Sequence, residues 1–322
     1  MIDITLQNFE ADLIHASMQQ PVLLDIWAPW CGPCKSLGPV LEKLETAYGG
    51  RFLLAKLNSD EQPEIAGQLS QAFGVRSIPF CVLFSQGAPV DGFVGAIPEA
   101  QIREFLDKHV PSESEMEAEA EVEEAEALMS AGGDIDTVLD KLQEAVLTDP
   151  ANDVARLDYL KVLLGLARSE PGRVAQARAA FEPVAVKVLS DPRFAAIEHW
   201  LKACEAAPGA RSPEALAAAV AANKRDFAAR YEAAQVLLAA GQLPAAMDEL
   251  LEILMRDKAW SDGLARKTYV AILELMTKPA PKAGAEAAGT GKGTLELSGP
   301  AAVASSDPVL DQYRRKLSMV LF

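Results

Sequence analysis

A Cys-Gly-Pro-Cys motif at residues 31–34 joins an apolar stretch to an amphipathic one, and this junction constrains the fold more than any other feature. Residues 22–27 form an apolar run broken by one carboxylate, which predicts a buried β-strand. Four apolar residues between 37 and 44 fall on one face of a helix. Pro33 suits a first helical turn, because its φ is already helical and its missing N–H has no partner there. We therefore expect Cys31 at a helix N-terminus.

This position favours a reactive thiolate at Cys31. Unpaired amides and the positive end of the helix dipole stabilise a thiolate, so the pKa of the Cys31 thiol is expected below its free value of about 8.5. Cys34 lies three residues on and shares the same helix face. A thiol held that close attacks a mixed disulfide on Cys31 with a high effective molarity. The spacing therefore suits rapid thiol–disulfide exchange better than a permanent bond.

Residues 25–35, Asp-Ile-Trp-Ala-Pro-Trp-Cys-Gly-Pro-Cys-Lys, closely resemble the active-site region of thioredoxins. Residues 55–58 resemble the third-strand segment of that family, and Ser77-Ile78-Pro79 resembles its cis-proline turn. Because several separated motifs agree in order, we expect residues 1–110 to form an α/β thioredoxin fold, with a central mixed sheet flanked by helices. The alternation of apolar and amphipathic runs predicts strands at residues 52–57, 80–84 and 90–94 and a closing helix at residues 101–109.

Length and charge narrow the class of protein. At 322 residues the chain is too long for one thioredoxin-sized unit, so we expect two domains. A formal net charge of -16 repels nucleic acid and anionic membranes, and we expect neither as a partner. The N-terminus lacks the basic and apolar segments of a signal peptide, and no run of about 18 apolar residues occurs. We therefore expect a cytoplasmic protein, whose four cysteines do not form a disulfide framework.

Composition divides the chain beyond the first domain into four segments. Residues 111–127 contain eight glutamates and are predicted to be a solvated acidic linker that runs into the first helix. Residues 128–278 show helical periodicity throughout, which predicts an all-α array. Residues 279–306 are dominated by Ala, Gly, Pro, Lys and Ser, the composition of a flexible tether. Residues 307–322 then form an amphipathic helix.

Internal repetition suggests what kind of array the helices form. Gly133, Gly172 and Gly241 are each followed by small or aliphatic residues at the same spacings of five, four and three. Gly172 and Gly241 are 69 residues apart, about twice the tetratricopeptide period of ~34. We expect each glycine to end one helix of a hairpin. Tetratricopeptide-like repeats are therefore predicted, with another alanine-rich helical array as the alternative. Helical arrays of both kinds generally bind other polypeptides in their concave face, so we expect the same of this region.

The C-terminal helix has two interpretations. Asp307 and Pro308 suit a helix start, and an apolar stripe follows. A basic amphipathic helix in an acidic chain suits partner binding, for which the candidate residues are Leu310, Tyr313, Arg314, Arg315 and Leu317. The second interpretation is equally favoured. In it the helix folds back onto the helical array and caps its last repeat, because a terminal repeat needs a cover.

Thioredoxin motifs, degenerate repeats and the C-terminal Tyr-Arg-Arg-Lys-Leu helix together resemble the CnoX/YbbN chaperedoxin family. The resemblance implies a redox-active holdase that binds unfolding proteins and protects or reduces their cysteines. It implies as partners unfolded or oxidised client proteins, a GroEL-type chaperonin and the Hsp70 system. Thioredoxin reductase is a further candidate partner. The alternatives are a thioredoxin-type disulfide reductase whose repeats only select partners, and an interaction scaffold with a vestigial dithiol.

The thioredoxin likeness also implies roles for single residues. Cys31 is the nucleophile and Cys34 the resolving thiol. Burial is expected to raise the pKa of Asp25, so that this carboxylate takes the proton from Cys34, with Lys56 modulating it. The alternative is that Asp25 is only a satisfied buried carboxylate. The substrate groove is expected to comprise Trp30, Gly32, Pro33, Ile78, Pro79 and Gly95.

Metal and cofactor sites are not expected. A zinc site needs about four ligands, and the chain has one Cys-x-x-Cys pair and three scattered histidines. Cys81 in an apolar strand and Cys204 in an alanine-rich helix are interpreted as small core residues. Trp200 and Trp260 are interpreted as hairpin-packing residues rather than cofactor platforms.

Overall fold

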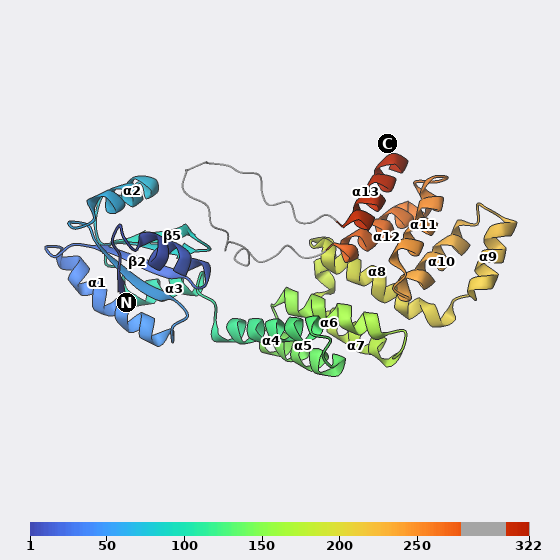
Figure 1. Cartoon of the computed structure of the whole chain (residues 1–322), viewed down its shortest axis with the longest axis horizontal. Coiled ribbons are helices and arrows are strands. Elements are labelled where there is room, and N and C mark those ends of the chain that lie inside the picture. Colours follow the sequence, from blue (N-terminus) through green and yellow to red (C-terminus); the bar gives the residue numbers. More distant parts are fainter. Residues whose placement is uncertain (278–306, 322) are drawn as a thin grey trace. The chain divides into compact units, whose positions relative to one another are not determined.

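The computed structural model describes residues 1–277 and 307–321, which form two compact units (Figure 1). The N-terminal unit comprises residues 1–116, and the helical unit comprises the described residues from 117 onward. The tether expected at residues 279–306 lies outside the described part of the chain.

A five-stranded sheet in the order β1-β3-β2-β4-β5 forms the centre of the N-terminal unit (Figure 1). β1, β3 and β2 are parallel, whereas β4 is antiparallel to β2 and β5 to β4. The predicted mixed sheet is therefore confirmed, although β1 was not foreseen. The strands are β1 (Ile2–Asp3), β2 (Val22–Trp27), β3 (Leu53–Asn58), β4 (Phe80–Ser85) and β5 (Ala88–Val94).

Strand β2 contributes to an apolar core on each face of the sheet, because alternate side chains of a strand point to opposite faces. Leu24 and Ile26 enter the core shared with η1 and α2, and Leu23 enters the core shared with α1 and α3. Asp25 therefore faces the α1 side, at the middle of the sheet. The helices of this unit are η1 (Phe9–His15), η2 (Ala16–Met18), α1 (Gly32–Ala47), α2 (Pro63–Phe73) and α3 (Glu99–Asp107).

The helical unit contains helices and no strand among the residues that are described. No helix of the described residues is long and apolar enough to cross a membrane. The helices are α4 (Glu113–Ser130), α5 (Ile135–Thr148), α6 (Asp153–Leu166), α7 (Gly172–Phe181), η3 (Glu182–Leu189), α8 (Pro192–Ala206), η4 (Ala207–Gly209), α9 (Pro213–Ala222), α10 (Phe227–Ala239), α11 (Leu243–Leu254), α12 (Trp260–Met276) and α13 (Pro308–Leu321).

The acidic segment at 111–127 runs into a helix, as expected, but α4 begins earlier than expected, at Glu113, and the division between the two units falls within it, after Met116. Ala118, Val122 and Ala125 are buried on one face of α4, in the apolar core that also contains residues of α5. Small side chains at helical spacing give this helix a packing face that its glutamates obscure in the sequence.

The repeated offsets correspond to buried contacts between helices. Val138, Ala177 and Ala246, the first residues at these offsets, are fully buried. Gly241 has a φ of 72° and follows the end of α10, as predicted. Gly172 is instead the first residue of α7, so the prediction that it ends a helix was wrong. The repeats therefore share packing positions more closely than they share turn geometry.

Helix α13 folds back onto its own array. Leu310 and Tyr313 are buried, and Leu317 packs against the same apolar core of α11 and α12. The Tyr269 hydroxyl donates to the Tyr313 carbonyl oxygen at 2.8 Å, and the Tyr313 hydroxyl lies 3.1 Å from Asp248 Oδ2. The capping interpretation therefore describes this structure, in which the apolar stripe is not free to bind a partner.

Replacing Tyr269 with phenylalanine is expected to loosen α13 by about 1 kcal/mol, because the variant lacks the hydroxyl donor to the Tyr313 carbonyl. Hydrogen exchange of the α13 amides should then accelerate by about five-fold. Tyr231→Phe is the matched control, since the Tyr231 hydroxyl pairs with Thr268 rather than with α13. Unchanged exchange in α13 of Tyr269→Phe would show that this bond does not hold the helix.

Candidate thiol-disulfide active site

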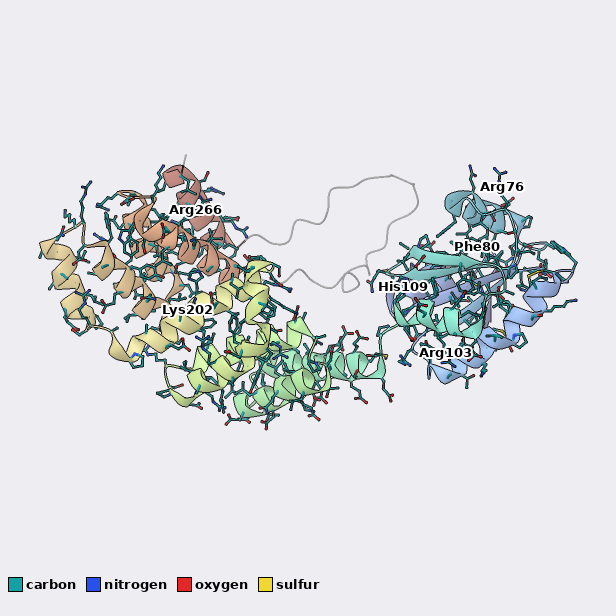
Figure 2. All side chains as sticks on the ribbon, turned by 180° about the vertical axis from the view of Figure 1, so that it is seen from behind. Arg76, Phe80, Arg103, His109, Lys202 and Arg266 are labelled. Carbon is teal, nitrogen blue, oxygen red and sulfur yellow. A yellow bond between two sulfur atoms is a disulfide. The ribbon has the colours of Figure 1, made fainter. Side chains whose placement is uncertain are left out.

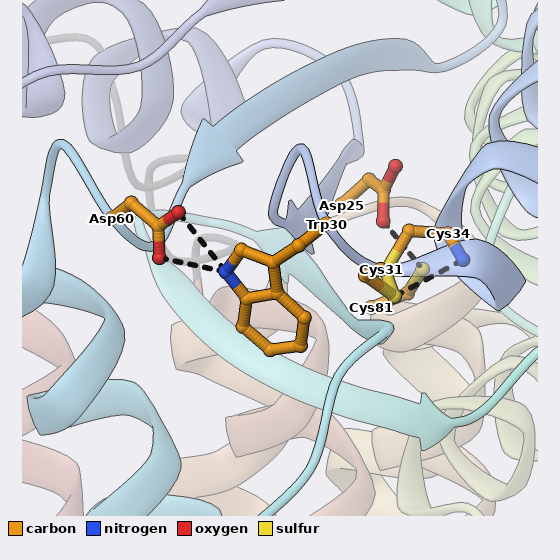
Figure 3. Close-up of a disulfide and its surroundings, with 6 residues drawn as sticks. All are labelled: Asp25, Trp30, Cys31, Cys34, Asp60 and Cys81. Carbon is orange, nitrogen blue, oxygen red and sulfur yellow. Dashed lines mark hydrogen bonds between the residues drawn. A yellow bond between two sulfur atoms is a disulfide. The ribbon is translucent and has the colours of Figure 1, made fainter.

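Cys31 and Cys34 form a disulfide at the start of α1 (Figure 3). Cys31 is the N-cap residue, and its Sγ accepts a hydrogen bond from the backbone N–H of Cys34 at 3.2 Å. Both sulfurs are largely buried, with Trp27 and Ile78 packed against them. The predicted place of Cys31 at a helix N-terminus is confirmed. The same amide that now bonds the disulfide sulfur is placed to stabilise a thiolate after reduction.

Asp25 lies behind the disulfide with only 1% of its surface exposed. In the sheet it is paired with Lys56 of β3 on one side and Cys81 of β4 on the other. Burial raises the pKa of the Asp25 carboxyl to about 6, against the opposing attraction of the Lys56 ammonium. The predicted rise in this pKa is confirmed. A carboxylate with this pKa can exchange a proton near neutral pH.

Lys56 acts on Asp25 through space. Its Nζ lies 2.6 Å from Glu42 Oε1 of α1, and this ion pair occupies the ammonium. The pull of Lys56 on the Asp25 carboxylate is therefore electrostatic, without a hydrogen bond between them.

Lys56→Met is expected to raise the pKa of Asp25 further, by about one, because the variant lacks the Lys56 ammonium, whose attraction lowers that pKa. A carbon-13 NMR titration of the Asp25 carboxyl in the oxidised protein measures this directly. Lys43→Met, which removes a lysine paired with Glu99 elsewhere on α1, is the control. An unchanged titration in Lys56→Met would exclude the electrostatic role.

The expected groove residues come from several segments of the N-terminal unit, and of those outside α1 Ile78 packs against the disulfide. Trp30 is 70% exposed, and its Nε1 donates to both carboxylate oxygens of Asp60 at 3.2 and 3.1 Å (Figure 3). The Ile78-Pro79 peptide bond is cis, and the Pro79 carbonyl accepts from the Gly95 N–H at 2.8 Å. Gly32 and Pro33 form the first turn of α1. The fold thus brings the turn at residue 79 and Gly95 together, with Ile78 against the thiols.

Two neighbours of the site, Asp60 and Cys81, were not predicted as site residues. Asp60 follows β3 and has no local motif to mark it, since its contact with Trp30 spans 30 residues. In the sequence, Cys81 is indistinguishable from the other core residues of an apolar strand. Only the β2–β4 register, which sets it opposite Asp25, reveals its place.

His109 and His199 each contact a side chain of their own unit. The Nε2 atom of His109, labelled in Figure 2, is 2.9 Å from Asp91 Oδ2 on β5. His199 lies in the helical unit, where its Nδ1 is 3.2 Å from the Thr268 hydroxyl. Across the described ranges, no three His, Cys, Asp or Glu residues are grouped as metal ligands.

Comparison with known proteins is most informative for the N-terminal unit. A family model described as Thioredoxin matches residues 1–108. Thioredoxin 2 of Chlorobaculum tepidum is 45% identical over 104 residues, which cover 32% of this chain and 90% of that protein. The chain belongs to the thioredoxin family. Thioredoxin 1 of Nostoc sp. is 38% identical over 107 residues, or 33% of this chain and 94% of that protein. The chloroplastic M-type thioredoxin of Pisum sativum is 40% identical over 99 residues, which cover 31% of this chain and 55% of that protein.

A second family model, described as Tetratricopeptide repeat, matches residues 206–285. The predicted combination of a thioredoxin fold with a tetratricopeptide-like helical region is therefore confirmed. The thioredoxin relatives, together with the Cys31–Cys34 pair, support the expected thiol–disulfide oxidoreductase activity. These relatives match about a third of the chain.

Proposed function

We propose that this chain is a cytoplasmic redox-active chaperone of the CnoX/YbbN type. In this proposal the thioredoxin domain exchanges disulfides with unfolded or oxidised clients, and the helical unit holds those clients. The observation that carries the proposal is the N-capping position of Cys31, with Cys34 one turn on and a buried carboxylate of pKa about 6 behind them.

The exchange begins from the reduced dithiol. The Cys31 thiolate attacks one sulfur of a client disulfide, the client S–S bond breaks, and the other client sulfur leaves as a thiolate. Asp25 then takes the proton of Cys34, whose thiolate attacks the Cys31 sulfur and releases the second client thiolate. The client gains two electrons, and the dithiol becomes the Cys31–Cys34 disulfide. Renewed turnover requires a dithiol reductant, for which we propose thioredoxin reductase.

Exposed apolar side chains on the helical unit support the holding function. Leu189 is 95% and Val186 is 79% exposed on η3, and Val154 is about half exposed at the start of α6. The Lys187 Nζ lies 2.7 Å from Asp153 Oδ2, which ties these two segments together. We call Val154, Val186 and Leu189 the apolar strip. Apolar surface left open to solvent is the kind of surface that binds unfolded segments.

A cavity of about 490 Å³ in the same unit offers a second apolar contact. It lies between the end of α8, α10 and the start of α12, and it is lined by Tyr231, Trp260 and several alanines together with the polar side chains of Glu232 and Gln235. Aromatic walls and small side chains suit apolar side chains of an extended client.

Transfer of clients to a GroEL-type chaperonin and the Hsp70 system is proposed to use the outer face of α13. Leu310 and Tyr313 are committed to the array, whereas Arg315 and Met319 are exposed on the opposite side. Arg315→Glu/Met319→Asp should therefore weaken chaperonin pull-down and leave insulin reduction unchanged. Arg168→Glu, an exposed charge reversal on the α6–α7 connection, is the control. Equal chaperonin recovery with both variants would argue against this face.

The second candidate function is a thioredoxin-type disulfide reductase whose repeats only select partners. The thioredoxin matches favour it, since they extend over the N-terminal unit alone. Aggregation of a chemically denatured client in the presence of Cys31→Ser/Cys34→Ser separates the two functions. We expect the double variant to suppress aggregation as well as the wild type does. If the wild type itself fails to suppress aggregation, the reductase alternative is preferred.

A further inference from the structure

Cys81 is a buried thiol that the exchange reaction does not use. It lies in β4, directly opposite Asp25 of β2, and none of its surface is exposed. Its Sγ donates a hydrogen bond to Asp25 Oδ1, with 3.7 Å between the two atoms (Figure 3). A weak thiol donor therefore meets the carboxylate that is proposed to serve as base.

Neither Lys56 nor Cys34 replaces the hydrogen bond from Cys81 to Asp25. Lys56 on β3 is bonded to Glu42 of α1 rather than to Asp25. Cys34 on α1 is held in the disulfide. Among the described residues no other group donates a hydrogen bond to the Asp25 carboxylate, and Oδ2 has no donor. A buried carboxylate with one bound and one unbound oxygen has a preferred orientation and a defined place for a proton.

We infer that Cys81 is a positioning residue for Asp25: its thiol binds Oδ1 and leaves Oδ2 to receive the proton of Cys34. The inference rests on the proposed role of Asp25 as the base. A thiol suits this task because it donates one hydrogen bond in the volume of a small apolar side chain, so that the sheet stays packed.

The surroundings keep Cys81 a donor rather than a nucleophile. Burial and the neighbouring Asp25 carboxylate raise the pKa of the Cys81 thiol well above its usual value, so that it stays protonated. A protonated, fully buried thiol cannot attack a client disulfide. Its hydrogen bond in turn favours the charged form of Asp25, and opposes part of the rise in the Asp25 pKa that burial causes.

The test compares Cys81→Val with Cys81→Ser in the full-length protein. Valine is close in size and lacks a donor, so the Asp25 pKa should rise and the pH profile of insulin reduction should move to higher pH by about half a unit to one unit. At pH 6 the kcat should fall about two- to five-fold, as the ionised fraction of Asp25 does, while KM is unchanged because the groove is untouched. Serine restores a donor and should bring the profile back toward the wild type.

Controls separate this effect from general damage. Cys204→Val alters the other buried free cysteine, which lies on α8 of the helical unit, and should leave the profile unchanged. If Cys81→Val does not fold, Cys81→Ala provides the donor-free variant. Identical pH profiles for wild type and a folded donor-free variant would overturn the inference while Asp25→Asn still slows reduction. If Asp25→Asn has no effect either, the proposed base itself is wrong.

Discussion

Cys31→Ser should reduce the rate of insulin reduction by about 10³-fold or more, to the level of the uncatalysed reaction. The variant keeps the helix N-terminus but replaces the thiol, whose thiolate is the nucleophile, with a hydroxyl that does not form a comparable nucleophile. Insulin turbidity at pH 7 with a small dithiol as reductant measures the loss.

Cys34→Ser should fail at a different step. Cys31 can still attack a client disulfide, but no second thiol releases it, so a mixed disulfide with the client accumulates. Cys204→Ser is the matched control, because it removes a buried thiol far along the chain from the dithiol. A Cys31→Ser protein as active as the wild type would indicate that the dithiol is vestigial and favour the scaffold alternative.

Asp25→Asn should stabilise the thioredoxin domain by about 3 kcal/mol above pH 6, while slowing resolution of the mixed disulfide. The carboxyl has a pKa of 3.8 when unfolded and about 6 when folded. Below pH 3.8 both states hold the proton and Asp25 costs nothing. As pH rises from 3.8 to 6, the unfolded state ionises Asp25 while the folded state keeps the proton, so the wild type loses about 1.4 kcal/mol for each unit of pKa difference, and the loss is complete above pH 6. The variant escapes this loss.

Urea unfolding of the oxidised full-length proteins at pH 3.5 and pH 8, with hydrogen exchange of the β2 amides to isolate the N-terminal unit, measures the gain. We expect a difference between variant and wild type at pH 8 and almost none at pH 3.5. Glu10→Gln alters an exposed carboxylate and should show no gain at either pH. An equal gain at both pH values would show that charge burial is not its cause.

Local sequence patterns were sufficient for the elements that carry the chemistry. The apolar run at 22–27 and the proline after Cys31 defined strand β2 and the start of α1, because both depend on neighbouring residues. The raised pKa of Asp25 was also predictable, since a carboxylate within an apolar strand must be buried. Contacts between distant residues were not predictable. Cys81 meets Asp25 only through the register of two strands that are 56 residues apart.

Two features of the helical unit, the start of α4 and the docking of α13, could not be predicted from the sequence. The start of helix α4 was predicted too late in the chain, because its packing face consists of Ala118, Val122 and Ala125, which the glutamates outnumber. The apolar stripe of α13 fitted a partner and its own array equally well. The decisive contact, from the Tyr269 hydroxyl to the Tyr313 carbonyl, has no signature in the sequence of either helix.

The most direct test of whether one chain both holds and reduces its clients uses the double variant Val186→Asp/Leu189→Asp. Its rate of reduction is measured on two substrates, a denatured protein and a small disulfide. Aspartates in the apolar strip should weaken binding of unfolded chains without touching the dithiol. We predict that reduction of a denatured, disulfide-containing protein falls at least several-fold, while reduction of a small aromatic disulfide is unchanged. Met255→Asp, a charge on another exposed apolar residue of the same unit, is the control. Equal rates of wild type and double variant on the denatured protein would contradict the proposed chaperone function of the helical unit.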